Sequence, residues 1–282
     1  MASTCIFDRI FIVIFENELE SAVRQDAFML SLERQGVRLS DYHGVAHPSQ
    51  PNYVAAIAGT TIVPDDNVHD INRNNLVDLL ESKGISWKAY IENLPPNNKS
   101  VGNSPDGLYF RKHNPFISFD NIRNNGQRLA KIVNASQLAA DTAANELPQF
   151  CWYTPNIQND GHTPPGVSVG DSSGSVAFLS VWLKGFLTPL LNEPNFYNGT
   201  LIVIVFDESI PYEDNHVYAT LLGKMVKAGT TESGRYDHYS LLRTIEENFQ
   251  LGTLGNSDVT ANWFQFLWGI KSEAFNWSRH RQ

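Results

Sequence analysis

The stretch FIVIFEN (residues 11–17) decides the fold, and LIVIVFDE (residues 201–208) repeats its pattern. In each stretch a continuous run of β-branched and aromatic residues leads directly into polar side chains. These polar residues are Glu16, Asn17, Asp207 and Glu208. Apolar runs of this length are typical of strands buried on both faces of a sheet. Because ligands bind outside the carboxyl ends of the strands in open α/β sheets, the four polar side chains meet there if the strands are neighbours.

Such a cluster of carboxylates predicts a bound cation. Carboxylates crowded together repel one another, and one of them must take up a proton unless a cation lies between them. An oxygen-rich ligand set favours Mg²⁺, Ca²⁺ or Mn²⁺, and Zn²⁺ is not excluded. The alternative is that each polar pair simply ends its strand at the protein surface.

The composition sets limits on the classes of protein that fit. The 282 residues are 42% hydrophobic and 18% charged, which is consistent with a single domain over residues 1–282. The net charge of -9 argues against a nucleic acid or an anionic membrane as a general partner. Cys5 and Cys151 make neither a disulfide framework nor a metal knuckle, and Cys151 lies in an apolar run that predicts a buried thiol.

Membrane insertion and secretion are not expected from the sequence. No apolar run is expected to approach a membrane span. The first residues lack the basic region and the cleavage site of a secretory leader, so a cytoplasmic location is expected unless a leader has been trimmed. The oligomeric state is left open.

Strand and helix patterns alternate along the chain. Strands are predicted over 9–15, 86–91, 149–153, 201–206 and 217–222. Helices are predicted over 23–34, 51–58, 76–80, 175–191, 238–249 and 259–268. This alternation predicts a three-layer α/β/α sandwich with a mostly parallel central sheet. Residues 95–119 are rich in Asn, Pro and Gly, and we expect them to form a long irregular loop over the active site.

A serine precedes one of the predicted helices in HPSQPNY (residues 47–53). Pro51 suits the first turn of the helix, and Ser49 lies at or just before the cap. A serine there faces the positive end of the helix dipole and free N–H groups, which stabilise an alkoxide or bind a phosphate. A plain helix cap is the alternative, but a metal held by the acidic pairs would activate Ser49 as a nucleophile.

Other polar residues lie at predicted strand ends, helix starts and loops. They are Asp160 and His162 after the strand 149–153, Lys112 and His113 in the irregular loop, His238 at the start of the helix 238–249, and Glu92 at a strand end. A lone inward-facing histidine such as His238 is most simply a hydrogen-bonded core residue. Glu92 has no evident partner, and we interpret it as a structural or supporting residue.

The chain resembles the metal-dependent phosphoesterases, a family that includes microbial and fungal acid phosphatases and non-haemolytic phospholipases C. The resemblance covers residues 10 to about 266. It rests on the following motifs, in this order along the chain: a strand followed by Glu-Asn, then HPSQPNY, WKAYIENLP, KHNPF, TPNIQNDGH, VFDES and DHYSLLRTIE. The family is related to the alkaline phosphatase superfamily, so the resemblance implies an alkaline-phosphatase-like fold.

The resemblance also implies a role for each matching residue. Ser49 would be the nucleophile, and the metal ligands would be Glu16, Asn17, Asp207, Glu208 and Ser49. Contacts to the phosphoryl group, or protonation of the leaving group, would come from His113, His162 and His238. Substrate would further contact Asn52, Asp160 and Lys112. Thr163 stands where the family often carries an acidic residue after the NDGH motif, which leaves Asp160 as the carboxylate available to orient His162.

Together these features predict metal-dependent hydrolysis of small phosphate monoesters through a phosphoserine at Ser49. Cleavage of a phosphodiester or phospholipid is the alternative, and the short chain with no appended lipid-binding domain favours a monoester. A Ser-His-Asp acyl hydrolase is disfavoured because no Gly-x-Ser-x-Gly surrounds Ser49. A non-catalytic, metal-stabilised binding protein on the same fold is a further alternative.

Overall fold

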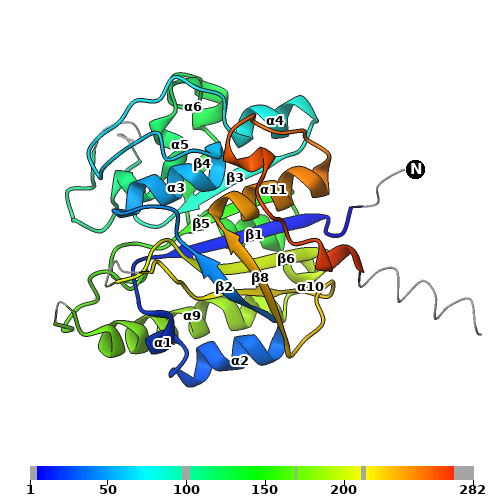
Figure 1. Ribbon diagram of the computed structural model, residues 1–282. Helices are drawn as coiled ribbons and strands as arrows, with labels where there is room; N and C mark the ends of the chain where they lie inside the picture. The colour runs from blue at the N-terminus through cyan, green and yellow to red at the C-terminus, as the bar shows by residue number, and fades with distance from the viewer. Residues whose placement is uncertain (1–4, 97–101, 169, 211–213, 270–282) are drawn as a thin grey trace, which may run out of the picture.

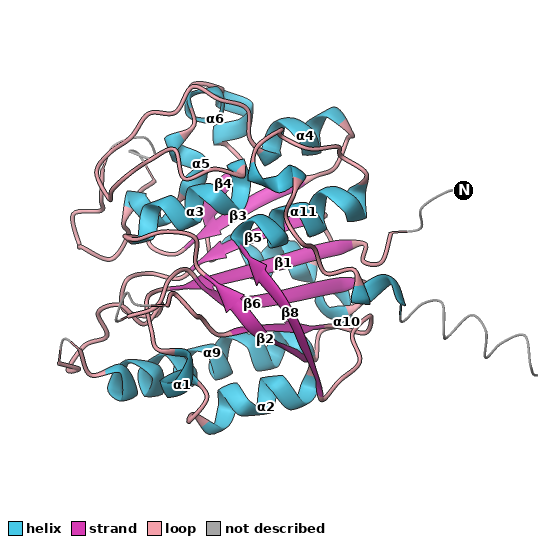
Figure 2. Cartoon of the chain, viewed as in Figure 1, coloured by secondary structure: helices cyan, strands magenta, loops and turns pink. Residues whose placement is uncertain are grey.

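A single eight-stranded sheet organises the protein (Figures 1 and 2). The computed structural model describes residues 5–96, 102–168, 170–210 and 214–269. The strands are β1 (Arg9–Phe15), β2 (Val37–His43), β3 (Trp87–Ile91), β4 (Ile132–Asn134), β5 (Phe150–Thr154), β6 (Thr200–Phe206), β7 (Ala219–Leu222) and β8 (Thr230–Asp237). Their order is β4-β3-β5-β1-β6-β7-β2-β8, and only β7 runs antiparallel to its neighbours. The predicted mostly parallel sheet is therefore confirmed.

Helices cover both faces of this sheet (Figure 1). One face carries α3 (Ser49–Ala58), α4 (Leu76–Ser82), α5 (Pro115–Ser118), α6 (Asp120–Arg123) and α11 (His238–Phe249). The other carries α1 (Glu20–Val23), α2 (Ala27–Gln35), α9 (Ser172–Leu191) and α10 (Pro194–Tyr197). Shorter elements are η1 (Arg111–His113), α7 (Gly126–Leu129), α8 (Gln137–Ala143) and η2 (Ser257–Val259). The arrangement is the three-layer sandwich that the sequence predicts.

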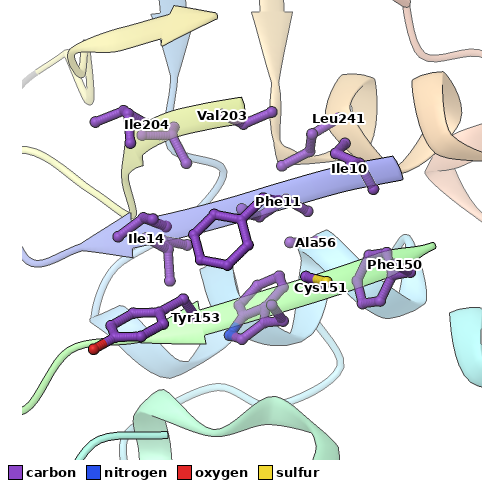
Figure 3. Close-up of a cluster of buried hydrophobic side chains, with 14 of the residues drawn as sticks. Ile10, Phe11, Ile14, Ala56, Phe150, Cys151, Tyr153, Val203, Ile204 and Leu241 are labelled. Atoms are coloured by element: carbon purple, nitrogen blue, oxygen red, sulfur yellow. The ribbon is translucent and has the colours of Figure 1, made fainter. Parts of the chain in front are cut away.

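The core lies around the central strand β1, whose neighbours are β5 and β6 (Figure 3). Residues 10–15 are completely buried, because helices cover both faces of the sheet. Phe11 packs edge-on against Phe196 of α10 at a ring distance of 4.9 Å, and Cys151 of β5 is a buried thiol as expected. Each fully buried large apolar side chain contributes about 2 kcal/mol to folding, so this strand is fixed firmly in place.

Several elements differ from their predicted form. The helix predicted over 23–34 begins later, at Ala27, because Asp26 caps α2 and accepts hydrogen bonds from Phe28 N–H at 2.8 Å and Met29 N–H at 2.9 Å. The pattern does not predict β2, β4 or β8. Of the helix predicted over 259–268, residues 261–264 are irregular. Within the expected loop 95–119, η1 and α5 are helical, and residues 97–101 lie outside the described residues.

Helix α9 is more apolar than expected from the sequence. Its best 18-residue window has a mean hydropathy of 1.4, so within the described part of the chain it is the one helix long and apolar enough to cross a membrane. The expectation that no apolar run approaches a membrane span is therefore wrong on composition. In the fold α9 contacts α1, α2 and α10 in the helical layer. Helices that belong to a protein core can have the same length and apolar composition.

Candidate active site

The two acidic strand ends meet at one edge of the sheet. β1 and β6 are parallel neighbours, with Phe15 opposite Phe206, and the N–H of Asp207 donates to the carbonyl of Phe15 at 2.9 Å. Glu16 and Asp207 therefore lie side by side. Both are completely buried, as is Glu208. Carboxylates from the two apolar strands thus converge in the interior instead of ending at the surface.

Ser49 lies between two of these carboxylates. It is the first residue of α3, and its Oγ is 2.9 Å from Glu16 Oε2 and 3.0 Å from Glu208 Oε1. A hydroxyl carries a single proton and can donate only one of these hydrogen bonds. The second contact at this distance requires either a proton on a carboxyl or a cation nearby. The hydroxyl, only 2% exposed, is therefore held in an anionic environment at the start of a helix.

His113 joins the cluster from the segment predicted to be an irregular loop. Its Nε2 is 2.9 Å from Glu16 Oε1, and its Nδ1 is 3.5 Å from Asp160 Oδ2. Tyr53 stacks on the His113 ring and donates its hydroxyl hydrogen bond to Glu16 Oε1 at 2.8 Å. The potential ligand atoms of Glu16, His113 and Asp160 lie within 4.8 Å of one another. These three residues form a possible metal site.

Burial and mutual repulsion shift the pKa values of this cluster. Burial and the charge of Glu16 raise the pKa of Glu208 to about 8 and that of Asp207 well above its usual range. Burial also raises the pKa of Glu16, but His113 outweighs this effect and holds it well below its usual range. Burial lowers the pKa of His113, yet the carboxylates of Glu16 and Asp160 bring it to about 9. The cluster therefore holds more acidic groups than its own cations neutralise.

Unpartnered atoms in the cluster fit a divalent cation. Within the described part of the chain, Oδ2 of Asp207 and Oδ2 of Asp160 are buried without a hydrogen-bond partner, and so is His113 Nε2 despite its close approach to Glu16. Buried polar atoms are nearly always satisfied, so orphaned carboxylate oxygens call for a ligand. Oxygen donors with one imidazole suit Mg²⁺, Ca²⁺ or Mn²⁺ and also accommodate Zn²⁺.

Two predicted site residues are engaged with the protein itself. Asn52 Oδ1 accepts from the N–H groups of residues 45 and 46, and its Nδ2 donates to the carbonyls of residues 46 and 48. Because both amide hydrogens are used, Asn52 shapes the loop before Ser49 instead of donating to a phosphoryl oxygen. His238 contacts the Asp207 carbonyl through Nε2 at 2.6 Å and the Tyr42 hydroxyl through Nδ1 at 3.2 Å. His238 therefore holds the backbone of Asp207 in place, and burial lowers the pKa of His238.

Three other predicted residues lie at the edge of the cluster. Lys112 pairs with Asp66 at 2.8 Å, and Asp66 also accepts the Gln50 N–H at the start of α3. The exposed His162 has its Nδ1 2.7 Å from the hydroxyl of Thr163, so Thr163 contacts the imidazole where the family often has an acidic residue. The half-buried Asn17 lines a cavity beside His162.

Sequence reasoning misses two contacts of the cluster. His47 Nδ1 forms a hydrogen bond with Glu208 Oε2, and Tyr53 bonds to Glu16. Both residues belong to the HPSQPNY segment, which the sequence singles out for Ser49 alone. Their spacing from Ser49 could have indicated these contacts. His47 lies two residues before the start of the helix and Tyr53 four residues after it, so both are close to its first turn.

Comparisons with known proteins show the family of the chain. The chain belongs to the Phosphoesterase family, whose model matches residues 20–252. It is 38% identical over 268 residues to a probable acid phosphatase of Kluyveromyces lactis, covering 91% of this chain and 61% of that protein. It is 35% identical to an acid phosphatase of Aspergillus fumigatus, covering 91% of this chain and 58% of that one. A phosphatidylinositol-3-phosphatase of Mycobacterium tuberculosis is 28% identical, with 88% and 79% covered.

Solved structures share the fold at low sequence identity. A protein of the alkaline phosphatase superfamily from Vibrio parahaemolyticus matches with a TM-score of 0.62 at 12% identity, over 91% of this chain and 71% of that one. A phosphonate monoester hydrolase from Silicibacter pomeroyi gives 0.61 at 11% identity, with 93% and 77% covered. The alkaline-phosphatase-like fold implied by the sequence is confirmed. The chain spans about 60% of the length of the two fungal phosphatases.

Proposed function

We propose that this chain hydrolyses phosphate monoesters through a covalent phosphoserine at Ser49, with a divalent metal ion in the acidic cluster. The observation that carries the proposal is the Ser49 hydroxyl at the first turn of α3, within 3.0 Å of both Glu16 and Glu208. Acid phosphatases among the relatives support the substrate class. Vanadate and small phosphorylated compounds are the expected ligands.

The residues that would hold the metal are Glu16, Asn17, Asp207, Glu208 and Ser49, with His113 and Asp160 as further donors. A bound divalent ion supplies Lewis acidity, which lowers the pKa of a serine hydroxyl and neutralises charge on phosphoryl oxygens. Tyr53 orients the Glu16 carboxylate through Oε1, and His238 holds the backbone of Asp207 through its carbonyl. Such supporting contacts orient metal ligands and are costly to lose.

The chain's own residues then account for the chemical steps. Ser49 Oγ bonds to phosphorus as its proton passes to a neighbouring carboxylate, and the bond from phosphorus to the alcohol oxygen breaks. His162, at the rim, gives a proton to the departing alkoxide. It then takes a proton from the water that cleaves the phosphoserine, which releases inorganic phosphate, and the carboxyl group returns its proton to Ser49. The α3 N-terminus and Lys112 oppose the charge on the phosphoryl oxygens throughout.

A chromogenic monoester tests the proposal. Metal-loaded protein should hydrolyse 4-nitrophenyl phosphate, lose activity on treatment with a chelator, and regain it with Mg²⁺, Ca²⁺ or Mn²⁺. Ser49→Ala should abolish turnover while its melting temperature stays near that of the wild type. Retained turnover in Ser49→Ala would move the nucleophile to a water. Preference for bis(4-nitrophenyl) phosphate would favour the diesterase alternative, and no turnover of either ester would favour a binding protein.

A further inference from the structure

A second cavity lies beside the acidic cluster, and the proposed chemistry leaves it without a role. Its volume is about 220 Å³. The loop after β1 contributes Asn17 and Glu18, the loop after β5 contributes His162, and the first turn of α9 contributes Ser172 and Ser175. The cavity therefore connects the predicted metal ligands to the outer helical layer.

Glu18 is the unusual residue of this cavity. Its side chain is only 4% exposed, and within the described residues its Oε2 has no hydrogen-bond partner. Burial raises the pKa of this carboxyl group to about 7, although hydrogen bonds from Ser172 and Ser175 oppose the shift. Above that pH the group is a carboxylate, and a carboxylate oxygen buried without a donor favours a ligand that supplies one. The cavity thus offers an acceptor that the protein itself leaves incompletely used.

The charges around the cavity select the kind of group that fits. Among the described residues that line it, the ionisable ones are Glu18 and His162, and there is no lysine or arginine. The other cavity at the cluster, next to Gln50, is lined by Arg111 and Lys112. A second phosphate or a carboxylate would be repelled by Glu18, whereas an ammonium group would form a charge-assisted hydrogen bond with it.

The proposed mechanism also directs the departing alcohol toward this cavity. In-line displacement expels the leaving group on the side of phosphorus opposite the nucleophile, next to the group that protonates it. His162, which has this role in the proposed mechanism, lines the cavity. A volume of about 220 Å³ equals about seven waters at roughly 30 Å³ each, enough for a small alcohol and too little for a lipid tail.

We propose that this cavity is the leaving-group pocket, and that Glu18 makes the protein prefer phosphate esters of small amino alcohols. The inference rests on the proposed function and adds a substrate class to it. The ammonium group of the alcohol pairs with the Glu18 carboxylate, while the ester oxygen lies near His162.

Three esters and two variants test this pocket in the metal-loaded protein. The esters are O-phosphoethanolamine, its uncharged analogue propyl phosphate, and the anionic phosphoglycolate. The wild type should give the highest kcat/KM with O-phosphoethanolamine and the lowest with phosphoglycolate. Glu18→Gln keeps the shape of the side chain and removes its charge, so it should lower kcat/KM for O-phosphoethanolamine by about 10- to 100-fold. It should change kcat/KM for propyl phosphate by less than about threefold.

Glu20→Gln is the matched control. Glu20 lies two residues away, pairs with Arg38 at 2.7 Å and does not line the cavity. It removes the same charge, so it should leave the preference for O-phosphoethanolamine over propyl phosphate unchanged. Equal losses on all three esters in Glu18→Gln, or no preference in the wild type, would overturn the pocket. Failure of the wild type to cleave any ester would overturn the proposed function itself.

Product inhibition gives a second readout that needs no variant. Ethanolamine should inhibit hydrolysis of 4-nitrophenyl phosphate by the wild type at concentrations about tenfold lower than propanol, because only ethanolamine carries the ammonium group. Equal inhibition by the two alcohols would contradict the assignment of Glu18, even if Glu18→Gln did not fold.

Discussion

Replacing Glu246 with glutamine should stabilise the protein, and more so as the pH rises. Glu246 lies on α11, is 2% exposed, and within the described residues has no hydrogen-bond partner on either carboxyl oxygen, although Arg243 lies 4.0 Å from Oε2. Its neighbour Asp258 is fully buried and accepts the N–H groups of Leu254 at 2.6 Å and Asn256 at 2.7 Å. Burial, and next the charge of Asp258, raise the pKa of Glu246 from 4.5 to about 9.

The sign of the effect follows from this raised pKa. Folding favours the protonated form, so the contribution of Glu246 is fully present below pH 4.5 and is lost as the pH rises through about 9. At pH 7, which is 2.5 units above the usual pKa of 4.5, the protein has lost about 3 kcal/mol of its free energy of unfolding, at 1.36 kcal/mol per unit. Glutamine stays neutral and can donate to Asp258, so Glu246→Gln avoids this loss.

Urea unfolding at pH 4.5 and pH 7.0 measures the effect directly. The free energy of unfolding of Glu246→Gln should exceed that of the wild type by about 3 kcal/mol at the higher pH and by less than about 1 kcal/mol at the lower pH. Glu146→Gln, at an exposed position, is the control and should match the wild type at both. A gain from Glu246→Gln that is the same at both pH values would refute the buried-carboxyl reasoning.

Three further predictions concern the site. Asn52→Ala removes four hydrogen bonds and should lower the free energy of unfolding by about 2–4 kcal/mol in a urea titration; a loss under 1 kcal/mol would contradict its role in the loop before Ser49. His113→Ala should weaken Mn²⁺ binding at least tenfold by calorimetry, because it removes one donor of the cluster; unchanged affinity would place the metal elsewhere. Tyr53→Phe removes one bond to Glu16 and should raise the metal dissociation constant by less than His113→Ala does; a larger effect would contradict this ranking.

The sequence predicts the elements that are buried on both faces. β1 and β6 are readable because the helices on both faces of the sheet leave them no solvent-facing positions, so every residue after the first one of each strand is apolar. β8 lies at the sheet edge and alternates between half-buried and exposed residues, several of them charged or small, so it contains no apolar run. Only β4, with three residues, is too short to give a periodic signal.

The sequence likewise predicts only part of the candidate site. Glu16, Asp207 and Glu208 follow readable strands, and the sheet order alone brings them together. His113 comes from a segment without periodicity, and its approach to Glu16 depends on how that segment folds over α3. The sequence also does not show in which direction a side chain points. Asn52 and His238 lie near the cluster, but Asn52 bonds to the backbone, and His238 bonds to the Asp207 carbonyl and to Tyr42.

The central claim is that the acidic strand ends, with a bound cation, make Ser49 a nucleophile. Its most direct test is to quench metal-loaded protein with acid during turnover of a ³²P-labelled phosphate monoester and to locate the label by peptide mass spectrometry. Label on Ser49, absent after chelation and absent in Ser49→Ala, is the result we expect. Sustained turnover with no label on the protein, or label on another residue, would contradict the account.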